Sequence, residues 1–155
     1  MDKPENKPDH RIEARALLGL GRASLGSLAE RDGRPYPFVS LVLPARSADG
    51  EIILLLSDLS DHAKNLQRDP RASLLMDGTL ELKEPLTGPR LTLLGEVQVS
   101  PDQAGDKALY LKAHPEAEMY AGFGDFRFYR FRWFEGLFVA GFGRIFRLKP
   151  EELKD

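Results

Sequence analysis

The feature that most constrains the fold is a succession of strand-like segments joined by tight turns. Apolar runs at 23–28 and 36–44 flank Arg31-Asp32-Gly33-Arg34-Pro35, and an Asp-Gly pair between apolar runs is typical of a β-hairpin. Because strands and helices do not alternate regularly, a parallel sheet is disfavoured. The pattern predicts a mainly β (α+β) fold, an antiparallel barrel of six to seven strands with short helices. The remaining strand-like runs are 51–57, 71–76, 90–99, 125–134 and 137–142, the last two joined by Glu135-Gly136.

Two or three short helices are expected among these strands. Asp9 can cap a helix that ends near Gly19, and Ser60 can cap a second helix that Pro70 stops. A third helix is expected to open at Ser100, with proline at its first position, and to stop at about His114.

A chain of 155 residues is the size of one domain. Residues 1–8 are polar and contain two prolines, so we expect a disordered N-terminal tail there. Residues 9–148 are expected to form the single barrel domain, and residues 149–155 a C-terminal tail.

Composition and charge exclude several classes of function. The chain has no cysteine, so a disulfide framework, a thiolate metal site and a cysteine nucleophile are ruled out. With a formal net charge of −2, the chain lacks the excess of basic residues that is typical of a nucleic-acid-binding protein. The charged start is unlike a signal peptide, and the longest apolar run, Ile52 to Leu56, is too short to span a bilayer. We therefore expect a cytoplasmic protein without nucleic-acid or membrane partners.

The motifs of common catalytic and metal sites are missing. The histidines His10, His62 and His114 do not share a helical spacing, so no metal site is expected. No nucleophile elbow, P-loop or Rossmann fingerprint occurs.

The segment 125–134 carries aromatic and arginine side chains on both faces. A strand with one face in water would show one polar face. We therefore expect the second face to be covered, by a partner subunit or a flat ligand. The alternative is that helices of the same chain cover it.

The most informative segment for function is 54–66, where a buried strand ends in hydroxyls and leads into a helix. The free N–H groups of a helix start attract anions, and His62 and Lys64 add cationic groups. Ser57 and Ser60 can add hydrogen bonds. The alternative is that Ser60 only caps the helix and Lys64 is a solvated surface lysine. Polar residues on neighbouring strands slightly favour an anion site over this alternative. These residues are Ser40, which is isolated among apolar neighbours, and the strip Arg90, Thr92 and Glu96.

The order of these pieces resembles the pyridoxamine 5′-phosphate oxidase-related family of FMN-binding split barrels. The resemblance covers residues 11–146 and rests on four segments: Gly33–Tyr36, Ser57–Leu66, Asp69–Leu75 and Arg90–Gly95. Longer runs resemble the subgroup related to haem-utilisation proteins, namely 62–66, 84–90, 114–126 and 139–144.

The resemblance implies a homodimer with FMN in a groove between subunits. It would place the phosphate at Ser60–Lys64 beside Asn65, and the isoalloxazine along Ser40, Leu41, Val42 and Ser57. It would place Arg90 near the ring or tail, while Trp133 and Arg144 are candidates to close the groove from the partner.

By the same resemblance the function is that of a flavin-dependent oxidoreductase acting on an unknown small molecule. The alternative is a haem-binding module that uses the same groove. Arg144-Ile145-Phe146 lacks the histidine with which vitamin B6 oxidases grip substrate, and no histidine follows His114. No residue is identified as an obligatory acid, base or nucleophile, so whether the chain is an enzyme stays open.

Overall fold

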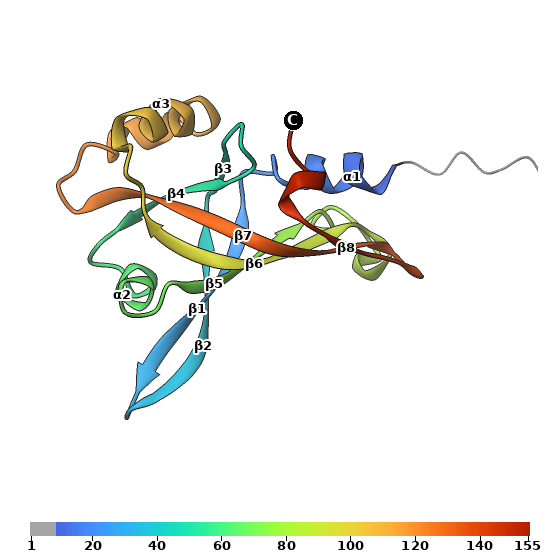
Figure 1. Ribbon diagram of the computed structural model, residues 1–155, viewed down its shortest axis with the longest axis horizontal. Helices are drawn as coiled ribbons and strands as arrows, with labels where there is room; N and C mark the ends of the chain where they lie inside the picture. Colours follow the sequence, from blue (N-terminus) through green and yellow to red (C-terminus); the bar gives the residue numbers. More distant parts are fainter. Residues whose placement is uncertain (1–8) are drawn as a thin grey trace, which may run out of the picture.

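The computed structural model describes residues 9–155, and the tail expected at 1–8 lies outside the described residues. Figure 1 shows a strongly twisted antiparallel sheet with short helices at its ends. The sheet order is β2-β1-β5-β6-β7-β4-β3, and β8 pairs with β7. The eight strands are β1 (Ala23–Arg31), β2 (Arg34–Val42), β3 (Ala45–Arg46), β4 (Ile52–Ser57), β5 (Arg71–Asp77), β6 (Arg90–Val99), β7 (Phe126–Gly141) and β8 (Arg144–Leu148).

This architecture confirms the mainly β antiparallel prediction, with one strand more than the six or seven expected. The β1–β2 hairpin forms at the predicted turn, where Arg31 pairs with Arg34. Asp32 and Gly33 both have positive φ, 52° and 74°, which is the backbone that a two-residue hairpin turn requires.

The α-helices are α1 (His10–Leu17), α2 (Asp61–Arg68) and α3 (Gln103–Ala113), and 3-10 turns cover Pro85–Thr87 (η1), Pro115–Met119 (η2) and Pro150–Glu152 (η3). The predicted caps of the first two helices are confirmed, because Asp9 accepts from Arg11 N and Ser60 accepts from Ala63 N. The predicted start of the third was wrong. Its cap is Asp102, whose carboxylate accepts from Gly105 N. A carboxylate at this position satisfies the first-turn N–H groups, so the helix begins later than Ser100.

The predicted turn at Glu135-Gly136 was also wrong, because β7 runs through it without a break. The pairing shifts there: Leu94 faces Glu135 while Gly95 faces Trp133, which leaves Phe134 as the extra residue of a β-bulge. A bulge bends a strand without ending it. The chain reverses later, at Gly143, whose φ is 74°.

Two apolar clusters lie on opposite faces of β4 and β7. The larger fills the barrel and includes Tyr129, Phe131 and Trp133. The smaller joins Phe128 to Tyr110 of α3 and to Ala117 of η2. At this end, helices of the same chain therefore cover the second face of β7. We had expected a partner subunit or a flat ligand there, and the structure shows the alternative.

The last residues pack on the barrel. Residues 149–155, which the sequence indicated as a C-terminal tail, contain η3 and the fully buried Leu153. Arg46 donates to the carbonyl of Leu153 at 2.9 Å. Across residues 9–155, no helix combines the length and apolar character needed to cross a bilayer.

Candidate functional site

A groove of about 380 Å³ lies where β2, β4 and β7 meet the start of α2 and the side of α3. Its volume is within the range of small-molecule pockets, which are mostly apolar with a few polar groups. The polar members of the lining are Ser57, Ser60 and His62. The other lining residues are Leu41, Val42, Leu43, Leu55, Leu56, Tyr110, Tyr120 and Phe126. Five residues predicted for the cofactor site thus line one groove.

His62 is held in this groove by Ser40, which is a sixth predicted residue. The Ser40 Oγ lies 2.9 Å from the Nδ1 atom of His62. Burial lowers the pKa of His62 below its ordinary value, although the charge of Asp61 opposes the shift. At neutral pH the groove therefore contains an uncharged imidazole.

The two groove serines are already engaged within the turn from β4 to α2. Ser57 Oγ donates to Asp125 at 2.7 Å and accepts from Leu59 N at 3.2 Å. Ser60 Oγ donates to the carbonyl of Ser57 at 2.6 Å and accepts from Ala63 N at 3.3 Å. Both hydroxyls therefore stabilise the turn and the helix start.

Two more predicted residues of α2 lie outside the groove lining. Lys64 is exposed. Asn65 is buried, and its amide donates to Ser27 Oγ of β1 at 3.1 Å. Its position anchors α2 to the barrel. Asp61 adds a negative charge to the first turn of α2, which offsets the attraction of that turn for anions.

The remaining predicted residues are elsewhere in the chain. Arg90 donates to the carbonyls of Leu86 and Gly88 at 3.0 and 3.2 Å, so it braces the loop before β6. Trp133 is 5% exposed and donates to the carbonyl of Gly50 at 3.0 Å. Arg144 pairs with Glu13 at 3.0 Å. None lines the groove of its own chain, and the roles of Trp133 and Arg144 toward a partner's groove stay predictions.

The structure adds a part of the site that the sequence analysis missed, a clamp from α3 onto the groove wall. Tyr110 donates to the carbonyl of Leu43 at 2.7 Å, and the ring of His114 lies 2.8 Å from the carbonyl of Pro44. Burial raises the pKa of Tyr110. Tyr110 lies in the last turn of α3 and His114 is its C-cap, but nothing local in the sequence indicates which strand they face.

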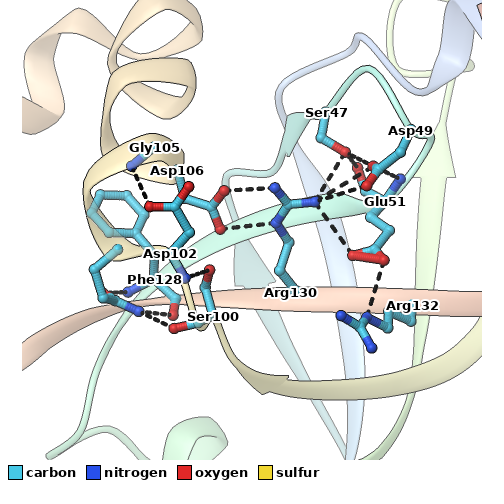
Figure 2. A network of polar contacts seen from close by, with 11 residues as sticks. Ser47, Asp49, Glu51, Ser100, Asp102, Gly105, Asp106, Phe128, Arg130 and Arg132 are labelled. Atoms are coloured by element: carbon cyan, nitrogen blue, oxygen red, sulfur yellow. Dashed lines mark hydrogen bonds and ion pairs between the residues drawn. The ribbon is translucent and has the colours of Figure 1, made fainter.

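A second polar cluster lies outside the groove, on the face of β7 near the start of α3. Figure 2 shows Arg130 between Asp106 of α3 and the carboxylates of the β3–β4 turn. Arg130 binds Asp106 through two hydrogen bonds of 2.8 and 2.6 Å, and it lies 3.3 Å from Glu51. Asp106 is 1% exposed. This network ties α3 and the β3–β4 turn to the sheet.

The other two histidines are not in the groove. His10 stacks on Phe146 with ring centroids 4.0 Å apart. His114 is buried against Pro44 as described above. Within residues 9–155 no group of three or more His, Asp or Glu side chains is arranged to hold a metal ion.

An antiparallel barrel with a groove at the start of α2 defines the class of protein as a split barrel. A structure from Clostridium acetobutylicum described as related to general stress protein 26, of the pyridoxinephosphate oxidase family, matches with a TM-score of 0.69. The match covers 94% of this chain and 99% of that one. Because the two sequences are 15% identical, it shows a shared fold and nothing more.

The family description "CREG, beta-barrel" matches residues 7–153, so the chain belongs to the CREG β-barrel family. The chain is 37% identical to "Non-canonical heme oxygenase HOZ, chloroplastic" of Arabidopsis thaliana over 86% of its length and 41% of that protein's. It is 29% identical to "Heme oxygenase HutZ" of Vibrio cholerae serotype O1 over 83% and 76% of the two lengths. A heme binding protein structure from Mycobacterium smegmatis matches with a TM-score of 0.82 and 28% identity, covering 95% and 60% of the two chains.

These relatives support the resemblance to haem-utilisation proteins and favour the haem alternative over the flavin oxidoreductase. The chain spans about two-fifths of the length of the Arabidopsis relative. FMN binding and the roles of the individual site residues stay predictions.

Proposed function

We propose that the chain is a haem-binding module that takes haem into the groove beside His62. The observation that carries the proposal is an apolar, aromatic groove with an uncharged imidazole in its wall. Neutral imidazole is a common ligand of haem iron, and an apolar pocket suits the porphyrin. Relatives named as heme oxygenases and a heme binding protein support the same ligand.

The residues of the groove fit haem better than they fit FMN. A flavin phosphate needs several donors, but Ser57 and Ser60 already have protein partners and Asp61 adds an opposing charge. Haem instead needs apolar contact with its ring and one iron ligand. The leucines of β2 and β4 with Tyr120 and Phe126 supply the contact, and His62 supplies a donor atom.

We also propose that a second copy of the chain completes the groove. On the outer face of the sheet, cross-strand neighbours form two rows that run from β6 through β5 and β1 to the edge strand β2. One row ends in Leu41 and the other in Val39. Leu41 and Val39 are 58% and 71% exposed. Such apolar patches mark interaction sites. Leu41 lines both the groove and this face, so a copy docked there would border the groove.

The test of haem binding is a titration of the purified protein with hemin and, separately, with FMN, followed by absorption and by calorimetry. We expect saturable hemin uptake with a shifted Soret band, and weaker or no uptake of FMN. Flavin uptake without saturable hemin binding would overturn the proposal. Adding a reductant and O2 to the hemin-loaded protein then measures whether bound haem is degraded, the activity named for the two curated relatives.

The test of the second copy is light scattering of the protein and of Leu41→Glu. We expect a dimer that becomes a monomer in the variant. A monomeric wild-type protein at micromolar concentration would refute the assembly while leaving the groove proposal standing.

A further inference from the structure

We infer that His62 Nε2 is the atom of this chain that ligates iron in the groove, and that Ser40 is the positioning residue that orients it. The inference rests on the proposed haem binding and names the iron ligand. The evidence is the set of contacts that each histidine and tyrosine side chain near the groove makes.

The two ring nitrogens of His62 are in different situations. Nδ1 lies 2.9 Å from Ser40 Oγ, whereas Nε2 has no hydrogen-bond partner within residues 9–155. The hydroxyl of a serine can accept a hydrogen bond, so it is compatible with the tautomer that carries its proton on Nδ1. In that tautomer the lone pair is on Nε2. A hydrogen-bond partner on the other ring nitrogen fixes the ring orientation and the tautomer of a metal-binding histidine.

The other histidines are unsuitable as ligands in this groove. The Nε2 atom of His114 lies 2.8 Å from the carbonyl of Pro44, and its Nδ1 atom lies 3.6 Å from the carboxylate of Glu116. His10 stacks on Phe146 of β8 and does not line the groove. Ligation by His114 would require breaking a buried contact that supports the groove wall.

Two tyrosines also line the groove and are the rivals of His62. Tyr110 donates its hydroxyl to the carbonyl of Leu43, and burial raises its pKa, so the phenolate that iron would bind is disfavoured. Tyr120 packs on Phe126 with ring centroids 5.1 Å apart, and no hydrogen bond of its hydroxyl occurs within the described residues. Tyr120 is therefore the ligand to test against His62.

The position of His62 in α2 gives the ligand a rigid support. Ser60 caps the helix two residues earlier, and Asn65 fixes the same helix to Ser27 of β1. Ser40 belongs to β2, so the imidazole is held between a helix and a strand that are both tied to the barrel. Such double support keeps a ligand in its binding geometry.

The experiment compares hemin binding by the wild type and by His62→Ala, using absorption, electron paramagnetic resonance and resonance Raman spectra. We expect His62→Ala to bind hemin at least tenfold more weakly and to lose the iron–histidine signal, and added imidazole to restore the spectrum. His10→Ala is the matched control and should bind hemin as the wild type does. A wild-type spectrum and affinity in His62→Ala would overturn the inference, as would an iron–tyrosinate signal in the wild type that Tyr120→Phe alone removes.

The role of Ser40 has its own readout. Ser40→Ala should weaken hemin binding by about tenfold, the lower end of the effect of removing a residue that hydrogen-bonds to a metal ligand. It should also shift the iron–histidine stretching frequency, and Ser40→Thr should restore it. An unshifted frequency in Ser40→Ala would remove Ser40 from the inference.

Folding and haem uptake are controlled separately. Circular dichroism of the apo variants checks the fold, and His62→Gln replaces His62→Ala if the smaller residue prevents folding. Failure of the wild type to take up hemin would refute the proposed function itself. Normal uptake by the wild type with unchanged spectra in the His62 variants would refute only the ligand.

Discussion

The ion pair between Asp106 and Arg130 offers a quantitative test of how α3 is held on the sheet. Asp106 is 1% exposed and Arg130 is 18% exposed, and two hydrogen bonds of 2.8 and 2.6 Å join them. Removing one partner of a buried ion pair costs about 3–5 kcal/mol because the other charge loses its counterion. Arg130 retains Glu51 at 3.3 Å and is partly solvated. We therefore expect Asp106→Asn to lower the free energy of unfolding by about 2–3 kcal/mol.

The assay is urea denaturation at pH 7 of the wild type, Asp106→Asn, Arg130→Met and the double variant. The double variant should be less destabilised than the sum of the single ones, because it leaves no unpaired charge. A loss below about 0.5 kcal/mol in Asp106→Asn, the size of an ordinary surface change, would show that this ion pair does not hold α3 on the sheet.

The same pair predicts a pH dependence. Burial alone would raise the pKa of Asp106, but hydrogen bonds from Arg130 and Ser100 and the charge of Arg130 lower it below its ordinary value. A lowered pKa means that the stabilisation is present above the ordinary value of 3.8 and is lost as the pH falls through the lower folded value. The difference in stability between wild type and Asp106→Asn should therefore shrink below about pH 4. A difference that stays constant down to pH 2 would contradict this assignment.

Four further predictions concern single residues. Gly95→Ala should destabilise the protein by about 3 kcal/mol or more in urea denaturation, because its Cβ would lie 2.6 Å from Trp133 Cα and closer still to the carbonyl of Arg132. Tyr110→Phe should cost about 1–2 kcal/mol by the same assay, since the carbonyl of Leu43 loses its donor. Ser60→Ala should lower the unfolding free energy by about 1 kcal/mol through loss of the α2 cap, whether or not a ligand is present. An NMR titration should give Asp69 a pKa of about 2, held there by hydrogen bonds from Arg71, and Arg71→Ala should return it toward 3.8.

Local signals explain why much of the fold could be predicted from the sequence. The Asp32-Gly33 pair fixes a turn through its positive φ values, and Asp9 and Ser60 satisfy helix-start N–H groups whatever surrounds them. The end of β7 could not be placed from such signals. Glu135-Gly136 has the composition of a turn, but the strand passes through it because β6 pairs with residues on both sides of the bulge.

The candidate site was partly predictable for the same reason. Ser57, Ser60 and His62 follow one another along a strand, a turn and a helix, so the sequence places them together. Ser40 reaches His62 from β2 only through the tertiary fold. Trp133 marks the limit of such reasoning, since a lone tryptophan in a strand suits a ligand site as well as the core cluster in which it lies here. Its expected role toward a partner's groove stays a prediction.

The central claim, that the groove beside His62 binds haem, is tested most directly by locating bound hemin on the protein. Paramagnetic hemin broadens the NMR signals of nearby amides, and zinc protoporphyrin serves as the diamagnetic control. We expect selective broadening at residues 40–43, 55–57 and 60–62 and at Tyr110, Tyr120 and Phe126, which border the groove. Broadening centred on Arg130 and Phe134 instead, or spread evenly over the sheet, would contradict it.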